Sequence, residues 1–250
     1  MAEPLLQAEA LVKRFGGLVA TDNVAIDVRP GEIHALIGPN GAGKTTLVGQ
    51  LTGNLRPDSG TIRFAGRDVT RLPTHARVRL GLARSFQITS VLREFTALDN
   101  AALAVQAHDG HSFRFLADVR RDHRLRDLAQ RNLETVGLGP RAGVIASALS
   151  HGEQRQLEIA MALAGTPKLL LLDEPMAGMG IEESQRLVEL LRRLKHRCGM
   201  LLIEHDMDAV FALADRITVL VYGRAIASGA PDEIRGNAEV RQAYLGEETS

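Results

Sequence analysis

A glycine-rich segment early in the chain has the residue types and spacing of a phosphate-binding loop. It lies between a predicted strand at 33–37 and a predicted helix at 44–51, and it reads Gly38-Pro39-Asn40-Gly41-Ala42-Gly43-Lys44-Thr45. The segment fills every fixed position of the G-x-x-x-x-G-K-[ST] pattern, in the strand-to-helix context that the pattern requires. Its glycines allow backbone N–H groups to converge on phosphate oxygens, and the helix N-terminus adds positive potential. We expect Lys44 to reach the β- and γ-phosphates of a nucleotide, Thr45 to bind Mg²⁺ and Thr46 to complete the site.

Two acidic residues, Asp173 and Glu174, follow a run of four leucines at 169–172. Such a run is typical of a central strand that is buried on both faces, and it delivers the acids at the carboxyl end of that strand. With a phosphate loop in the same chain, we expect Asp173 to hold Mg²⁺ through water. Glu174 is the expected base that orients or deprotonates an attacking water. Without the phosphate loop, the pattern would indicate only a strand that ends at solvent.

A third segment, Leu149-Ser150-His151-Gly152-Glu153-Gln154, begins a predicted helix shortly before the acidic strand. Ser150 followed three positions later by Glu153 is the pattern of a capping box, which alone would explain the segment. The hexapeptide also resembles the signature of ABC transporters, which usually reads Leu-Ser-Gly-Gly-Gln. With the other two motifs, the chain resembles an ABC ATPase subunit from roughly Leu5 to Gly246.

This resemblance implies that the chain binds ATP and Mg²⁺ in a composite site. The phosphate loop of one subunit would meet the signature segment of a second ATPase subunit, either a copy of this chain or a different one. The signature residues involved are Ser150, His151, Gly152 and Glu153. The resemblance also implies two integral membrane permease subunits as partners and, through them, a periplasmic substrate-binding protein.

Three further residues match positions with a role in that family. Gln87, between the core and a helical insertion, matches the glutamine that senses Mg²⁺ and the γ-phosphate, and His205 matches the switch histidine that contacts the γ-phosphate. Phe15 matches the aromatic residue that stacks on adenine; the family more often has Tyr there, but stacking needs only a π face. The resemblance implies that Gln87 and the stretch at 88–94 lie in the region that grips the membrane subunit. We expect substitutions at Val91, Leu92 or Phe95 to uncouple transport.

The chain departs from the family pattern at three positions. His151 replaces the first glycine of the signature pair, where its side chain would crowd the phosphate across the dimer or donate to it. Gly180 stands where the family commonly has Asp, and it has no side chain to form the usual hydrogen bond from that Asp across the dimer. Phe86 precedes Gln87 where many relatives have Pro.

Several stretches resemble one subfamily, the ATPases of branched-chain amino acid importers. These are the segments at 79–87 and 92–100, the Arg-rich segment that follows them and the loop at 178–180. Importers of urea and short amides share most of these features, and the ending at 240–247 also fits lipopolysaccharide-export ATPases. The resemblance therefore implies an amino acid importer, with an amide importer and a lipopolysaccharide-type exporter as alternatives.

The elements that must position these residues follow from the spacing of apolar residues. Helices are predicted at 44–51, 73–80, 149–160, 181–196 and 206–214, and strands at 5–12, 19–28, 33–37, 61–64, 82–85, 169–172, 200–203 and 217–221. We expect a single ABC ATPase domain of the α/β class over 1–250. Its phosphate-loop NTPase core, with a mainly parallel sheet and an N-terminal antiparallel β part, covers about 1–90 and 165–250. An inserted all-helical subdomain covers about 91–164.

Composition excludes several classes of function. The chain has 30 basic and 30 acidic side chains and only 4% aromatic residues, which argues against a nucleic acid partner. Its one cysteine, Cys198, excludes an intramolecular disulfide and a cysteine zinc site. The beginning of the chain does not have the pattern of a signal peptide, and no apolar run is long enough to span a bilayer. We therefore expect a cytoplasmic protein, peripheral on the inner face of the cell membrane through the permease subunits.

Two other function classes remain as alternatives. ABC ATPases that act on DNA carry long heptad coiled coils, and those that act on ribosomes carry two ATPase domains per chain; this chain has neither. A metabolic kinase would use the same phosphate loop, but it would not need the signature, the switch histidine and the glutamine together.

Overall fold

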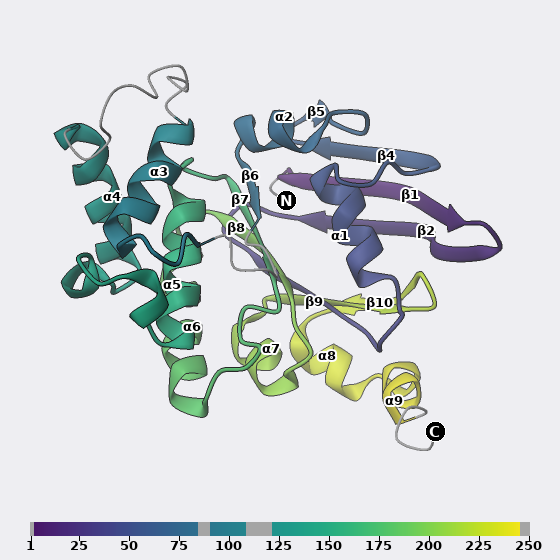
Figure 1. The fold of residues 1–250 in the computed structure, drawn as a ribbon. Helices are drawn as coiled ribbons and strands as arrows, with labels where there is room; N and C mark the ends of the chain where they lie inside the picture. The colour runs from purple at the N-terminus through teal and green to yellow at the C-terminus, as the bar shows by residue number, and fades with distance from the viewer. Residues whose placement is uncertain (1–2, 85–90, 109–121, 246–250) are drawn as a thin grey trace.

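The computed structural model describes residues 3–84, 91–108 and 122–245, which form two β-sheets and surrounding helices (Figure 1). The first sheet is antiparallel, with the order β2-β1-β4-β5, and comprises β1 (Leu6–Phe15), β2 (Leu18–Val28), β4 (Ser59–Phe64) and β5 (Arg67–Asp68). The second has the order β10-β9-β3-β8-β7-β6 and is parallel except for β10. Its strands are β3 (Ile33–Ile37), β6 (Leu82–Arg84), β7 (Leu169–Asp173), β8 (Gly199–Ile203), β9 (Arg216–Val221) and β10 (Arg224–Gly229). The expected α/β fold class is confirmed.

Helices cover both faces of the second sheet. They are α1 (Lys44–Thr52), α2 (Thr74–Arg79), α3 (Ala97–His108), α4 (His123–Thr135), α5 (His151–Leu163), α6 (Ile181–Leu194), α7 (Met207–Leu213), α8 (Pro231–Gly236) and α9 (Ala238–Leu245). Two short 3₁₀ helices, Gly139–Arg141 and Ala146–Ala148, lie between α4 and α5. Helices α3 to α6 lie on one face of the second sheet, whereas α1 lies on the other, between the two sheets (Figure 1). The boundaries of the helical subdomain, near 91 and 164, stay a prediction.

The four leucines of β7 show how this layering follows from the sequence. Because successive side chains of a strand point to opposite faces, alternate leucines join different cores. Leu170 and Leu172 pack in a core shared with α3 to α6, while Leu169 and Leu171 pack in the core between the two sheets, where α1 also lies. All four are fully buried, so β7 is buried on both faces as the sequence predicted, although it lies next to the edge strand β6 and not at the centre of the sheet.

The same parallel arrangement brings the chemical motifs to one edge. Strands β3, β8 and β7 are neighbours and run in the same direction, so their carboxyl ends lie side by side. The phosphate loop follows β3, Asp173 ends β7, and His205 comes two residues after β8. In open α/β sheets this carboxyl edge is where ligands bind.

Some details differ from the sequence-based predictions. Strand β10 and helices α8 and α9 had not been predicted, since their short segments show no sustained apolar period. Val91 is only 8% exposed and belongs to the core that α3 to α6 share, so it is a packing residue and not a contact for the membrane subunit. Leu92 and Phe95 are 47% and 38% exposed, as such a contact requires. Gln87 and Phe86 lie outside the described residues.

A buried arginine anchors the helix that follows the phosphate loop. Arg77 is 1% exposed, and its guanidinium donates to the carbonyl oxygens of Gln50 and Leu51 at 2.8 and 2.6 Å, at the carboxyl end of α1. It also donates to the carbonyl oxygens of Thr70 and Leu72. Burial lowers the pKa of Arg77 to about 10, which leaves the side chain charged at neutral pH. A cation here also complements the negative end of the helix dipole.

We therefore expect Arg77→Met to lower the free energy of unfolding by roughly 3 kcal/mol, since it removes the guanidinium donors from buried carbonyl oxygens such as that of Leu51. Urea denaturation followed by circular dichroism measures the loss. Arg79→Met is the control, because Arg79 is exposed on the same helix; we expect it to stay within about 0.5 kcal/mol of the parent. An equal loss in both variants would show that the carbonyl bonds are not the cause.

Candidate functional site

The phosphate loop is held tightly between neighbouring backbones. Gly38 has a φ of +154° and Gly43, the N-cap of α1, a φ of +102°. A Cβ atom at Gly38 would overlap the carbonyl oxygen of Leu220, and one at Gly43 would overlap that of Ala20. The glycines are therefore required both by the backbone conformation and by the close approach of β9 and β2.

The side chain of Lys44 folds back over the phosphate loop. Lys44 Nζ donates to the carbonyl oxygens of Gly38 and Pro39, at 2.5 and 2.9 Å. Its ammonium therefore lies over the first residues of the loop, from which it can turn toward phosphate oxygens. Thr45 is exposed and Thr46 is half-buried in the first turn of α1. The remaining residues of the loop range from the buried Ala42 to the exposed Asn40 and Gly41.

Asp173 is ion-paired in this structure. Its carboxylate is at the end of β7, where the residue is 5% exposed, and Arg84 Nη2 lies 2.7 Å from its Oδ2. Arg84 is the last residue of the neighbouring strand, β6. No sequence motif assigns a role to Arg84, although it immediately precedes the segment that contains Gln87.

Glu174 and His205 meet at the carboxyl edge of the sheet. Nδ1 of His205 lies 3.9 Å from Oε1 of Glu174, and both side chains reach solvent. Glu174 has a φ of +47°, which is uncommon for a residue other than glycine, and its N–H donates to the carbonyl oxygen of Ile203. The structure thus brings together the two residues that the sequence assigned to the γ-phosphate and the attacking water.

A buried acid that the sequence analysis left without a role supports this pair. Glu204 is 1% exposed; its Oε1 accepts a hydrogen bond from the N–H of Met176 and its Oε2 one from the N–H of His205, at 2.9 and 3.1 Å. Burial raises the pKa of Glu204 despite these bonds. Glu204 therefore ties the loop after Glu174 to the end of β8 and fixes the position of His205.

The signature segment forms the capping box that its sequence predicted. The N–H of Glu153 donates to the Ser150 hydroxyl, and the N–H of Ser150 donates to the Glu153 carboxylate. The Ser150 hydroxyl in turn donates to Oε1 of Glu183 at 2.9 Å, and the N–H of Gly152 donates to the same oxygen at 3.3 Å. The Ser150 hydroxyl, followed by the backbone N–H groups of Gly152 and Gly180, lowers the pKa of Glu183. The first turn of α5 therefore already holds an anionic group, from the first turn of α6.

One departure from the family pattern, His151, lies against the loop that contains another, Gly180. The ring of His151 lies beside Gly178, with Nε2 3.3 Å from the position that a Cβ of Gly178 would take. The histidine in the signature thus packs against the loop at 176–180 that has a glycine in place of Asp.

Phe15 lies at the end of the hairpin formed by β1 and β2. Its ring is 48% exposed, and the ammonium of Lys13 lies 5.6 Å from the ring centroid. Strand β2 of this hairpin approaches the phosphate loop at Ala20, so Phe15 belongs to the same side of the molecule as the loop. An exposed ring is available for stacking.

Within one chain, the residues proposed to bind nucleotide form two separate groups. Helix α1, which follows the phosphate loop, packs in the core between the two sheets, whereas α5, which begins at the signature, packs in the core on the opposite face of the second sheet. The phosphate loop and the signature segment of one chain therefore lie at different places in the fold (Figure 1).

A sequence profile decides the family. The profile of the ABC transporter family matches residues 21–177, more than half of the chain. The chain belongs to the ABC transporter family. A second profile, described as that of a branched-chain amino acid ATP-binding cassette transporter, matches residues 226–249 of this ABC ATPase.

Individual relatives cover the whole ABC ATPase. The high-affinity branched-chain amino acid transport ATP-binding protein LivG of Salmonella typhimurium is 42% identical over 99% of this chain and 100% of the relative. The lipopolysaccharide export system ATP-binding protein LptB of Acidithiobacillus ferridurans is 37% identical over 98% of each. Among solved structures, the ADP conformation of an ATP-binding cassette of an ABC transporter has a TM-score of 0.88 and 29% identity. It covers 98% of this chain and all of that one.

Proposed function

We propose that this ABC ATPase is the ATP-hydrolysing subunit of an importer for branched-chain or related amino acids. The observation that carries the proposal is the similarity to LivG along the entire chain. The family match at 226–249 supports it independently, because this C-terminal segment lies outside the general ABC profile. The similarity to LptB is lower, so an exporter of the lipopolysaccharide type is the second candidate, and an importer of urea or short amides the third.

The phosphate loop is proposed to bind ATP, with the adenine stacked on Phe15. Backbone N–H groups of the loop and the N-terminus of α1 offer hydrogen bonds and positive potential to the phosphates. To reach the β- and γ-phosphates, Lys44 exchanges its bonds to the carbonyl oxygens of Gly38 and Pro39 for bonds to phosphate oxygens.

The donor set at this edge fits Mg²⁺. Asp173 and Thr45 supply a carboxylate and a hydroxyl, the oxygen ligands that Mg²⁺ prefers, and the ion commonly uses one or two carboxylates together with substrate phosphates. No cluster of three or more His, Cys, Asp or Glu occurs within 3–84, 91–108 and 122–245, so no competing metal cage was found there. Bound Mg²⁺ would neutralise charge on the phosphates. Gln87 is proposed to contact the same ion.

Glu174 is proposed as the general base. Its carboxylate is accessible at the carboxyl edge, next to the phosphate loop, where a water can lie in line with the γ-phosphate. His205 lies beside Glu174 and offers a ring N–H to the γ-phosphate. Glu204 accepts the backbone N–H of His205, which restrains the backbone from which the imidazole extends toward Glu174.

The second half of the site is proposed to come from the signature of another ATPase subunit. In that subunit the Ser150 hydroxyl and the Gly152 N–H are the donors for the γ-phosphate, aided by the helix dipole of α5 and by the neighbouring residues His151 and Glu153. Both donors are bound to Glu183 in this structure, so the γ-phosphate has to take the place of that carboxylate. The partner is a second copy of this chain or a related ATPase.

Transport requires membrane subunits in this proposal. In the described ranges, no helix is long and apolar enough to cross a bilayer. We propose that the chain acts at the inner face of the cell membrane on two permease subunits, and indirectly with a periplasmic substrate-binding protein, without nucleic acid. The exposed Leu92 and Phe95 are the proposed contacts with the permease.

Reconstitution with candidate permease subunits in vesicles tests the substrate and the contact together. We expect ATP-driven uptake of leucine into vesicles; uptake of urea or acetamide instead, or export of lipopolysaccharide, would contradict the amino acid assignment.

We expect Leu92→Ala and Phe95→Ala to lower leucine uptake at least about tenfold, because each removes apolar contact area worth more than 1.4 kcal/mol. Both should spare the basal ATPase activity of the isolated subunit. Leu72→Ala, at an exposed leucine just before α2, is the matched control. Loss of basal activity in the two test variants would show that this stretch is core structure.

A further inference from the structure

The ion pair between Arg84 and Asp173 joins two adjacent parallel strands at the proposed metal site. In the ladder between β6 and β7, Arg84 stands opposite Leu171, two residues before Asp173. The side chain of Arg84 therefore reaches forward along the sheet to place Nη2 2.7 Å from Oδ2. The two side chains are only 16% and 6% exposed, so the pair is far less screened by solvent than a surface pair.

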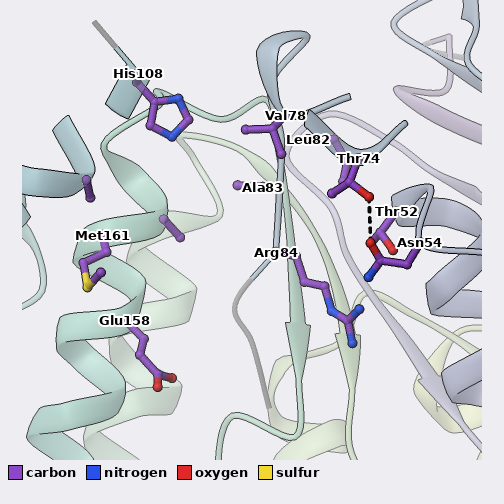
Figure 2. A pocket seen from close by; sticks show the side chains of 12 residues that line it. Thr52, Asn54, Thr74, Val78, Leu82, Ala83, Arg84, His108, Glu158 and Met161 are labelled. Atoms are coloured by element: carbon purple, nitrogen blue, oxygen red, sulfur yellow. Dashed lines mark hydrogen bonds between the residues drawn. The ribbon is translucent and has the colours of Figure 1, made fainter. Parts of the chain in front are cut away.

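Arg84 pairs with Asp173, although a second acid lines the same pocket. Its stem lines a pocket of about 220 Å³ between the core and helices α3 and α5, together with Leu82, Ala83 and Met161. Figure 2 shows the guanidinium turned away from Met161 and from Glu158, the other acid of this pocket. Glu158 is already paired with Arg155, at 2.8 Å.

The contact uses one oxygen of Asp173 and leaves the other available. Within the described residues, Arg84 Nη2 to Oδ2 is the hydrogen bond of this carboxylate, and Oδ1 accepts none. The buried Nε of Arg84 likewise has no partner in the part of the chain that the structure describes. A bidentate pair would use two parallel N–H groups and both oxygens. Here the carboxylate is fixed at one oxygen by the guanidinium, and Oδ1 keeps its acceptor capacity for another group.

We propose that Arg84 is a positioning residue of the metal site: it holds Oδ2 of Asp173 and so directs Oδ1 toward the water shell of the Mg²⁺ that accompanies ATP. The inference rests on the proposed function, in which Asp173 is the metal carboxylate. Carboxylates that bind metals are themselves hydrogen-bonded by outer groups, which set their orientation. Without the guanidinium, the carboxylate would lose both its fixed rotamer and its buried counter-charge.

The test is a titration of Mg²⁺ into the full-length protein in the presence of a fluorescent ATP analogue. For Arg84→Gln we expect the half-saturating Mg²⁺ concentration to rise by about 10- to 100-fold, the usual effect of removing an outer-shell partner. The affinity for the analogue in EDTA should stay at the parent value, because it depends on the phosphate loop. For Arg84→Lys we expect a half-saturating Mg²⁺ concentration between those of the parent protein and of Arg84→Gln. An ammonium supplies charge and one donor but no planar fork.

Arg126→Gln is the matched control. It breaks an ion pair of similar length, 3.1 Å to Asp99 in the helical part of the chain, and should leave the Mg²⁺ titration unchanged. Circular dichroism checks that each variant folds. If Arg84→Gln does not fold, the Mg²⁺ titration of Arg84→Lys tests the inference in its place.

Three outcomes overturn the inference, and they are distinguishable. An unchanged Mg²⁺ requirement in a folded Arg84 variant means that the pair only joins β6 to β7. A lower requirement means that the arginine competes with the metal for Asp173. If the parent protein binds the analogue without any dependence on Mg²⁺, the metal assignment of Asp173 fails, and the role of Arg84 fails with it.

Discussion

Lys44→Ala is expected to abolish tight ATP binding and to leave the fold intact. The ammonium of Lys44 supplies the side-chain charge of the phosphate loop, and charged hydrogen bonds contribute about 1.5–3 kcal/mol each. Loss of its bonds to two phosphate groups should raise the Kd for ATP by roughly 100-fold or more. In this structure Lys44 bonds to the carbonyl oxygens of Gly38 and Pro39, which lie on a loop held by its neighbours, so the fold does not depend on the lysine.

A fluorescent nucleotide titration measures the binding, and circular dichroism measures the fold. Lys195→Ala is the control, because Lys195 pairs with Asp215 after α6, outside the phosphate loop. Unchanged ATP affinity in a folded Lys44→Ala protein would contradict the assignment of the phosphate loop.

The local parts of this site were predictable from the sequence. The apolar residues Leu187, Leu190, Leu191 and Leu194 are all buried along α6, as their helical spacing predicted. The capping box at Ser150 and the buried strand that ends at Asp173 also follow from patterns only a few residues long. Such patterns are visible because each one is formed within a single helix or strand.

The contacts that adjust the site were not predictable in this way. Arg84 and Asp173 are 89 positions apart, and Ser150 and Glu183 are 33 apart. Each pair exists because the order of strands and helices brings two ends together, which no local period encodes. The burial of Val91, one residue before the exposed Leu92, likewise depends on how α3 packs.

Glu174→Gln is expected to lower the rate of ATP hydrolysis by about 10²–10⁴-fold, the usual cost of losing a general base. Glutamine has nearly the same shape but does not accept the proton. The backbone at 174 is held by the bond from its own N–H to the carbonyl oxygen of Ile203, which the substitution keeps. The variant should therefore still bind MgATP. If hydrolysis is what reopens the pair of subunits, the variant should also accumulate as an ATP-bound dimer, alone or with its partner ATPase.

A phosphate-release assay and size-exclusion chromatography with MgATP test these two effects separately. Glu189→Gln is the control, since Glu189 is an exposed acid on α6. Turnover near that of the parent protein would mean that the base lies elsewhere, and His205, whose Nδ1 is 3.9 Å from Glu174, would become the first candidate. A slow variant that stays monomeric with every candidate partner present would leave the catalytic role of Glu174 in place and would contradict the composite site. The two halves on opposite faces of the sheet would then require a different explanation, because one chain does not bring Ser150 to its own phosphate loop.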